Sequence, residues 1–160
     1  MSVSNKLANI VISIIDISMK RIEEVILFQI EQASKVSKIY SQREFDRLGI
    51  GITIEQWILL KIISESTELT QKELAQKSSR DPASITRTLD LLQKKEYITR
   101  EPVPNNRRSY YICLTKAGEA FINKNMKIVQ EQREKSVEGF SKEELEQFSG
   151  MLVRVKKNME

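Results

Sequence analysis

Residues 70–114 read TQKELAQKSSRDPASITRTLDLLQKKEYITREPVPNNRRSYYICL, and they contain the clearest structural pattern in the chain. A first helix is expected after Thr70, because Thr70 and Glu73 have the spacing of a capping box, in which each side chain accepts a hydrogen bond from the other residue's backbone N–H. After a polar turn, Asp81 can cap a second helix with Pro82 at its first position, where the missing N–H of proline costs nothing. The segment therefore predicts two short helices in succession.

The second helix, expected at about residues 82–95, has two contrasting faces. One is an apolar stripe of Ile85, Leu89 and Leu92, at the i, i+4 and i+7 spacing of a buried helix side. The other carries small, polar or basic residues, namely Ala83, Thr86, Arg87, Asp90 and Lys94, with Ser84 at its edge. Such a face is typical of a recognition helix that enters the DNA major groove. The alternative interpretation is an ordinary solvent-exposed helix face.

Two strands are expected after this helix, at about residues 98–103 and 109–114, with Leu69 as a third, minimal strand. Between them, Pro104-Asn105-Asn106-Arg107-Arg108 predicts a hairpin tip with two adjacent arginines at its end, since asparagine accepts turn conformations readily. Two helices followed by this hairpin, the wing at about 98–114, form a winged helix-turn-helix. The tip would reach the neighbouring minor groove, which favours arginine. The alternative is a basic loop that serves only solubility.

The distribution of charge supports a nucleic-acid partner. The 160-residue chain has 26 basic and 22 acidic side chains, a net charge of +4. Residues 70–112 hold nine basic and five acidic side chains, which leaves 17 of each sign in the rest of the chain. The whole basic excess therefore lies in the winged segment, and double-stranded DNA is the expected partner.

The chain has no histidine and a single cysteine, Cys113. This excludes Ser-His-Asp and Cys-His catalysis and zinc sites built on histidine or several cysteines, so neither an enzyme nor a bound cofactor is expected. A single cysteine also excludes an intrachain disulfide and fits a reducing cytoplasm. We interpret Cys113 as a packing residue rather than a redox sensor, because reactive thiols need an exposed, electropositive setting.

Two segments before the winged part contain apolar patterns. The run at residues 10–17 is too short and too interrupted to span a bilayer, and it lacks the features of a signal peptide. It must be covered by the protein's own core or, as we prefer, by another subunit, and the pattern leaves helix and strand open. From about Ile22 to Asp46 the apolar steps of three and four predict one long amphipathic helix. Its stripe consists of Ile22, Ile26, Ile30, Ala33, Val36 and Tyr40.

Three more helices are expected from their caps. Thr53 and Gln56 predict the start of one, with either Trp57, Leu60 and Ile63 or the adjacent Leu59 and Ile62 facing inward. After the wing, Thr115 caps a long helix with a looser stripe of Ala117, Phe121, Ile128 and Val129. A break follows near Gly139. Another capping box then starts a last helix at Ser141, and its heptad-like apolar repeat is Leu145, Phe148, Leu152 and Val155.

The expected fold class is mainly α with a small β-wing: a winged helix-turn-helix domain at residues 49–115, flanked by dimerisation helices at 1–48 and 116–160. The apolar stripes of the terminal helices have too little monomer surface to cover them. They therefore predict a homodimer.

The residues above make the chain resemble the MarR family of bacterial winged-helix transcriptional regulators, over about residues 22–157. The resemblance rests on an ordered set of motifs: TIEQW from Thr53, TQKELA from Thr70, DPASITRTLDLL from Asp81, KEYITR from Lys95, PNNRR from Pro104 and LTKAG from Leu114. It implies a homodimer joined through its terminal helices, in which each winged domain contacts half of a pseudo-palindromic operator. Such proteins usually repress transcription and are released by a small ligand or an oxidant.

The resemblance also implies roles for individual residues. Ser84, Thr86 and Arg87 match the base-reading positions of the recognition helix, and Arg108 matches the wing arginine, which enters the minor groove or pairs with Asp81. Asn106 departs from the family, which usually has an aspartate there to orient that arginine. The cysteine of the family's peroxide sensors lies near the N-terminus, where this chain has none.

Two sets of site residues follow. The DNA-binding set consists of the base-reading residues, Asn105 at the wing tip and four basic side chains that contact phosphate groups. These basic side chains are Lys72, Lys77, Arg80 and Arg107. An effector crevice would be lined by four aromatic residues, Phe28, Tyr40, Phe45 and Trp57, although aromatic residues at helical spacing also form ordinary cores. Alternative functions are a winged-helix protein interaction module and a nonspecific architectural DNA binder without effector control.

Overall fold

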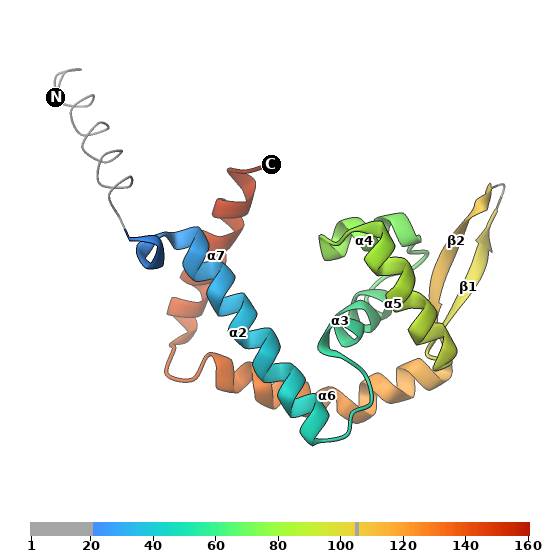
Figure 1. Ribbon diagram of the computed structural model, residues 1–160, viewed down its shortest axis with the longest axis horizontal. Helices are drawn as coiled ribbons and strands as arrows, with labels where there is room; N and C mark the ends of the chain where they lie inside the picture. Colours follow the sequence, from blue (N-terminus) through green and yellow to red (C-terminus); the bar gives the residue numbers. More distant parts are fainter. Residues whose placement is uncertain (1–20, 105) are drawn as a thin grey trace, which may run out of the picture. The chain divides into compact units, whose positions relative to one another are not determined.

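The computed structural model describes residues 21–104 and 106–160, apart from the side chains of Arg107 and Arg108 (Figure 1). The expectations for residues 1–20 and for Asn105 lie outside the described residues. The chain divides into two compact units, residues up to Arg47 and residues from Leu48 to Glu160. In the described part, no helix is long and apolar enough to cross a membrane.

The first unit contains a short 3-10 turn, η1 (Ile22–Glu24), and a long helix, α2 (Ile26–Arg47). The prediction of one continuous helix from Ile22 was wrong at its start, because the extended backbone of Val25 separates the two elements. The side chain of Gln29 donates a hydrogen bond of 2.9 Å to the carbonyl oxygen of Glu23 and so stabilises the break. The predicted apolar stripe is largely exposed in the single chain: Ile26 is 59% exposed and Val36 63%.

The second unit begins with three helices whose caps were predicted. They are α3 (Ile54–Ser64), α4 (Gln71–Ser78) and α5 (Pro82–Lys94). Capping boxes start α3 at Thr53 and α4 at Thr70, and the Asp81 carboxylate accepts the backbone N–H of Ser84 at the start of α5. The predicted inner stripe of α5 is fully buried, as are two of the inward residues of α3; these side chains are Ile85, Leu89, Leu92, Leu59 and Leu60. The helix-turn-helix therefore closes over an apolar core.

The hairpin consists of β1 (Ile98–Val103) and β2 (Asn106–Leu114), which pair antiparallel. The second strand begins three residues earlier than expected, so Arg107 and Arg108 belong to the strand and the turn is shorter. The pairing jumps between Pro102, opposite Tyr110, and Val103, opposite Asn106. Such an irregularity adds residues to one strand without ending the ladder.

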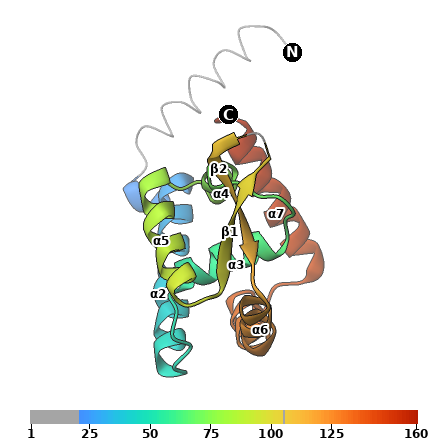
Figure 2. The same cartoon turned by 90° about the vertical axis from the view of Figure 1, so that its right-hand side faces the viewer.

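The expected third strand is present only as a single bridge. Thr70 pairs with Tyr111, and the carbonyl oxygen of Leu69 accepts the backbone N–H of Ile112 at 2.8 Å. This bridge ties the start of α4 to β2. Figures 1 and 2 show α5 beside the hairpin, and α5 contacts β1.

Two helices follow the hairpin, α6 (Lys116–Ser136) and α7 (Lys142–Lys157). Their predicted caps, Thr115 and Ser141, are confirmed. Of the stripe predicted for α6, Val129 is buried, Phe121 and Ile128 are half-buried, and Ala117 is exposed. The prediction missed the other buried residues, which are Gly118, Ile122 and Asn125. The pattern was misjudged because a glycine and an asparagine lie on the inner face, where side-chain polarity gives no sign of burial. Helix α7 has no buried residue, and its Phe148 is 53% exposed.

Candidate nucleic-acid interface

The outer face of α5 is held outward by the packing of its inner stripe. Thr86 and Arg87 are exposed, and Ser84 is half-buried near the helix start. Within the described part of the chain, no ion pair or hydrogen bond is recorded for the Arg87 side chain, and its five N–H donors are therefore available. The three predicted base-reading residues thus lie on the first two turns of one rigid helix.

Thr86 is held by two hydrogen bonds that the sequence did not reveal. Its hydroxyl group donates to the carbonyl oxygen of Pro82, one helical turn earlier, at 2.9 Å. The same oxygen accepts a hydrogen bond of 2.7 Å from the side-chain amide of Gln71, the first residue of α4. This second bond crosses between the two helices of the helix-turn-helix, so Gln71 fixes the side chain of Thr86 from outside α5.

The predicted phosphate-contacting residues differ in their surroundings. Lys72 is exposed on α4. Arg80 is paired with Glu55 of α3, with 2.9 Å between Nη2 and Oε2, and the two side chains are only 22% and 31% exposed. Lys77 donates a hydrogen bond of 2.9 Å to the hydroxyl group of Ser66. Of these three side chains, Lys72 is the one that makes no ion pair or hydrogen bond with the described residues, so its charge is available to a phosphate group.

The wing is attached to α5 through Arg100 of β1. Its Nη2 lies 2.7 Å from Oδ1 of Asp90, and its Nη1 donates a hydrogen bond of 2.6 Å to Oε1 of Gln93. Asp90 was expected to face the groove, but it serves instead as the anchor for this arginine. Sequence analysis missed Arg100, since the register that brings β1 beside α5 is a tertiary property.

At the wing tip, the structure describes Asn106 but not the side chains of Arg107 and Arg108. The Asn106 amide donates a hydrogen bond of 3.0 Å to the hydroxyl group of Ser109. This neutral contact lies within the hairpin itself. The expected roles of Asn105 and of the Arg107 and Arg108 side chains lie outside the described residues and stay predictions.

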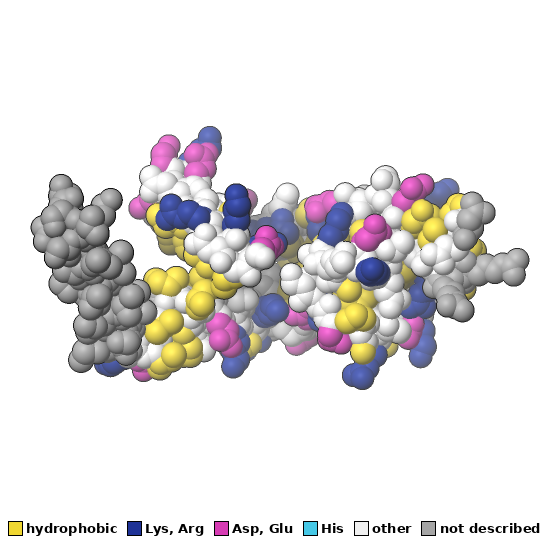
Figure 3. All heavy atoms as spheres, turned by 90° about the horizontal axis from the view of Figure 1, so that it is seen from above, with side chains coloured by type: hydrophobic (Ala, Val, Ile, Leu, Met, Phe, Trp, Pro, Cys, Tyr) yellow, Lys and Arg dark blue, Asp and Glu magenta, His cyan; other side chains and the backbone are white. Residues whose placement is uncertain are grey.

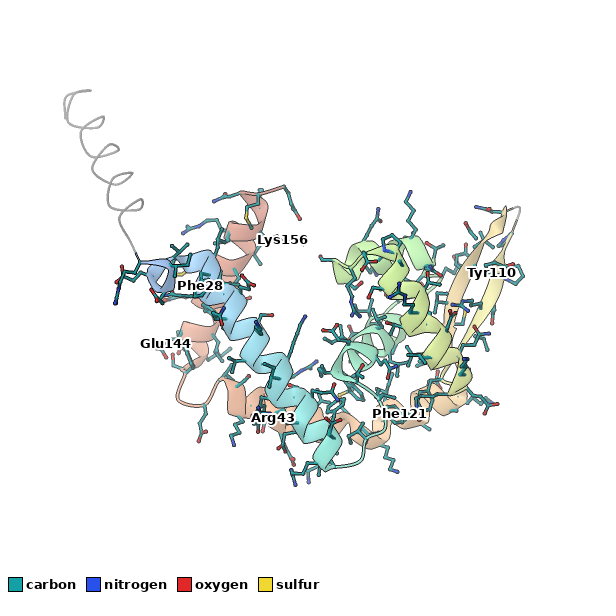
Figure 4. All side chains as sticks on the ribbon, in the orientation of Figure 1. Phe28, Arg43, Tyr110, Phe121, Glu144 and Lys156 are labelled. Carbon is teal, nitrogen blue, oxygen red and sulfur yellow. The ribbon has the colours of Figure 1, made fainter. Side chains whose placement is uncertain are left out.

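A groove of about 810 Å³ lies between α4, the start of α5 and β2. Its lining includes Lys72 and Arg80 and, from the hairpin, Tyr110. Tyr110, labelled in Figure 4, is 45% exposed. In Figure 3, the basic side chains around α4, α5 and the hairpin are scattered among polar, acidic and apolar ones. The groove is concave, and Lys72 brings a positive charge to it, which suits contact with a phosphate backbone.

The base of the wing is fixed to the start of α6. The Thr115 backbone N–H donates to the carbonyl oxygen of Tyr97 at 3.1 Å, and its hydroxyl group donates to that of Glu96 at 2.6 Å. The rings of Tyr97 and Phe121 stack with centroids 4.5 Å apart. Gly118 lies against the Tyr97 carbonyl oxygen with no room for a side chain. These contacts set the direction in which the hairpin leaves the domain.

The four aromatic residues of the predicted effector crevice belong to different units. Phe28 and Tyr40 are half-buried on α2, and Phe45 of the same helix is 1% exposed. Trp57 of α3 is 2% exposed, and its ring centroid lies 6.4 Å from that of Phe121. The burial of Phe45 and Trp57 is what core residues show, and the crevice stays a prediction.

Cys113 is half-buried in β2. Burial, together with the nearby Glu101 carboxylate, raises the pKa of the thiol above its ordinary value. A raised pKa disfavours the reactive thiolate, which agrees with a packing role. Across residues 21–104 and 106–160, no group of three acidic or cysteine side chains is arranged to hold a metal ion.

Two helices joined by a tight turn, an antiparallel hairpin after the second of them, and a bridge from the first helix to that hairpin define a winged helix-turn-helix protein. Residues 52–110 match the model of the MarR family. A probable transcriptional regulator from Pseudomonas aeruginosa has the same fold with a TM-score of 0.72 and 26% identity, over 84% of this chain and 99% of that one. The winged part of the chain is therefore similar to the MarR family, and the likeness of fold extends over most of the chain.

Two further similar structures were solved with DNA. The structure of the Staphylococcus aureus MepR–DNA complex has a TM-score of 0.74 and 23% identity, over 84% of this chain and 98% of that one. A mutant of Escherichia coli MarR, complexed with operator DNA, has a TM-score of 0.74 and 24% identity, over 85% of this chain and 98% of that one. At these identities the likeness concerns the fold.

Proposed function

We propose that this protein is a sequence-specific DNA-binding transcriptional regulator that acts as a homodimer. The observation that carries the proposal is the outer face of α5. The inner stripe of α5 is fully buried, and the first turns of this helix present Thr86 and Arg87 to solvent. A helix fixed in this way can bring short polar side chains and an arginine to base edges in the major groove.

The residue roles we propose on α4 and α5 follow from the surroundings described above, and those at the wing tip follow from the resemblance to the family. Ser84, Thr86 and Arg87 contact bases, and Lys72 contacts a phosphate group. Arg107 and Asn105 contact the backbone from the wing, and Arg108 enters the minor groove. Arg80 and Lys77 contribute less, because each already has an intramolecular partner. The structurally similar S. aureus and E. coli proteins were solved with DNA, which supports DNA as the partner of this fold.

The homodimer is supported by apolar surface that the single chain leaves uncovered. On α2, Leu27 is 53% exposed in addition to Ile26 and Val36, and on α7 Phe148 and Met151 are 53% and 54% exposed. Stripes of this kind on long helices need a partner to remove them from water. A two-fold dimer would place its recognition helices in half-sites about one helical turn apart, roughly 10 bp.

The test is selection of bound sequences from a random duplex pool at two salt concentrations. We expect an enriched inverted repeat with half-sites one turn apart, and weaker binding at the higher salt because phosphate contacts release counterions. Binding without enrichment would indicate an architectural DNA binder. An absence of binding at both concentrations would refute the proposal and favour a protein interaction module.

Arg87→Ala tests the central residue role on the selected operator. The substitution should weaken binding by about 1–3 kcal/mol and relax the preference at one base pair of each half-site. Arg133→Ala, which removes the same charge from α6, is the matched control. If Arg87→Ala instead weakened binding equally on all sequences, Arg87 would be a phosphate contact and its base-reading role would be refuted.

Ligand-responsive repression is the finer part of the proposal. A small aromatic acid that binds near α3 should change the fluorescence of Trp57, the only tryptophan, in a saturable way. The same compound should release the operator at matching concentrations. A fluorescence change without release would separate binding from control, and no change across a broad panel would count against an aromatic-lined crevice.

A further inference from the structure

We infer that Gln71 is a positioning residue for base recognition, and that it holds Thr86 so that the methyl group of Thr86, rather than its hydroxyl proton, contacts the DNA, selecting thymine. The inference rests on the proposed function and specifies how that site discriminates bases. It starts from the two hydrogen bonds at Thr86, one to the Pro82 carbonyl oxygen and one from the Gln71 amide.

These two bonds occupy most of the capacity of the hydroxyl group. A hydroxyl group has one proton to donate and two lone pairs. In Thr86 the proton is donated to Pro82, and one lone pair accepts from Gln71. The side chain is nonetheless exposed on the outer face of α5. What remains for a base is therefore the methyl group and one lone pair, and the hydroxyl cannot donate to a base without breaking the bond to Pro82.

The bond from Gln71 also fixes the rotamer. Threonine in a helix divides between two χ1 rotamers, because its hydroxyl group can bond to the carbonyl oxygen of the preceding turn in one of them. A second bond from another helix makes that one rotamer the preferred state and places the methyl group in a single direction. Thr88 of the same helix also donates its hydroxyl proton to the carbonyl oxygen of the preceding turn, that of Ser84, at 2.9 Å. Its side chain differs from that of Thr86 in being half-buried rather than exposed.

A fixed methyl group selects a base by apolar contact. In the major groove, thymine differs from every other base by its own C5-methyl group, which accepts contact with a threonine methyl. Replacing thymine with uracil removes that group and leaves the hydrogen-bonding pattern unchanged. The predicted loss is about fourfold in affinity per half-site, the factor expected from burying one methyl group.

The experiment measures the affinity of the selected operator with thymine or uracil at each position in turn. We expect one thymine per half-site whose replacement weakens binding by wild-type protein and by Thr86→Val, which retains a methyl in the same place. Thr86→Ser should bind both operators equally, since it keeps the hydroxyl group and lacks the methyl. If Thr86→Val lost the preference and Thr86→Ser kept it, the hydroxyl group would be the reader and the inference would be overturned.

Gln71→Met tests the positioning role, because methionine keeps the length of the side chain and has no donor. We expect it to reduce the thymine-to-uracil ratio with little change in binding to unrelated duplex, whereas Gln130→Met on the exposed side of α6 should change neither. In DNA-free protein, three-bond couplings should show one Thr86 rotamer in the wild type and rotamer averaging in Gln71→Met.

Three outcomes would count against the inference in distinguishable ways. An unchanged ratio and unchanged couplings in Gln71→Met would overturn the positioning role. A single rotamer in the free wild-type protein together with no uracil-sensitive thymine would overturn the selection of thymine while leaving DNA binding intact. No duplex binding by the wild type would refute the proposed function itself, and with it the role of Thr86 in recognition.

Discussion

Replacing Gly118 with alanine should destabilise the protein, although alanine is the better helix former. Gly118 is the third residue of α6, and a Cβ atom there would overlap the carbonyl oxygen of Tyr97 and approach Cδ1 of Leu114 to 2.9 Å. The carbonyl oxygen belongs to the backbone and accepts the N–H of Thr115 at 3.1 Å, so it cannot turn aside as a side chain can. Either the chain at Tyr97 or the start of α6 must move.

The size of the effect follows from two opposing contributions. Alanine in place of glycine stabilises a helix by about 1 kcal/mol. Forcing an extra carbon into a packed site typically costs about 1–3 kcal/mol, and a backbone neighbour puts this site at the upper end. The net loss should be about 1–2 kcal/mol, which lowers the Tm of a chain of this length by roughly 2–8 °C.

Gly150→Ala is the matched control, because Gly150 also lies inside a helix, α7, and a Cβ atom there would meet nothing within 4 Å. It should stabilise the protein by up to about 1 kcal/mol. Both variants are compared with wild type by urea unfolding at one fixed protein concentration, since dimerisation makes stability depend on concentration. The reasoning is refuted if Gly118→Ala is as stable as Gly150→Ala.

Three further predictions concern charged and reactive groups. Arg80→Met should lower the free energy of unfolding by about 1–2 kcal/mol, between the values for exposed and buried ion pairs. Lys72→Met should leave that free energy unchanged and reduce the salt slope of DNA binding by about one unit. If Arg80→Met changed the salt slope and Lys72→Met changed the stability, Arg80 would be the phosphate contact and Lys72 the structural residue. The hydrogen bonds from Thr70 lower the pKa of the Glu73 carboxyl. The stabilising effect of the Glu73 carboxylate should therefore be present above its ordinary pKa and be lost as the pH falls through the lowered pKa. The difference in unfolding free energy between wild type and Glu73→Gln should vanish in acid, and a constant difference would contradict this. Because the pKa of the Cys113 thiol is raised, its alkylation by iodoacetamide should be slower than that of free cysteine at neutral pH and should accelerate only at alkaline pH, and fast labelling at pH 7 would show the thiol to be exposed and activated.

Local rules were sufficient for most of the secondary structure. The starts of α3, α4, α5 and α7 were predicted correctly from caps, because a cap depends on residues three positions apart in the chain. The buried stripe of α5 was predicted for the same reason, since helical spacing alone defines which side chains share a face. The errors fell at Val25, at the start of β2 and on α6. At Val25 a side-chain contact from the first turns of α2 accompanies the break, at β2 the pairing with β1 decided the outcome, and on α6 a glycine and an asparagine lie on the inner face.

The candidate site divides in the same way. The amino-acid sequence by itself determined that residues 70–114 form a winged helix-turn-helix, that Thr86 and Arg87 lie on the outer face of its second helix, and that the basic excess lies there, because these follow from periodicity and composition. Only the tertiary structure decided which polar groups meet. It paired Arg80 with Glu55 and Arg100 with Asp90, and it brought Gln71 to Thr86. The residues of each pair lie 10 to 25 positions apart in the chain, so their meeting depends on how helices and strands pack, which no local pattern records.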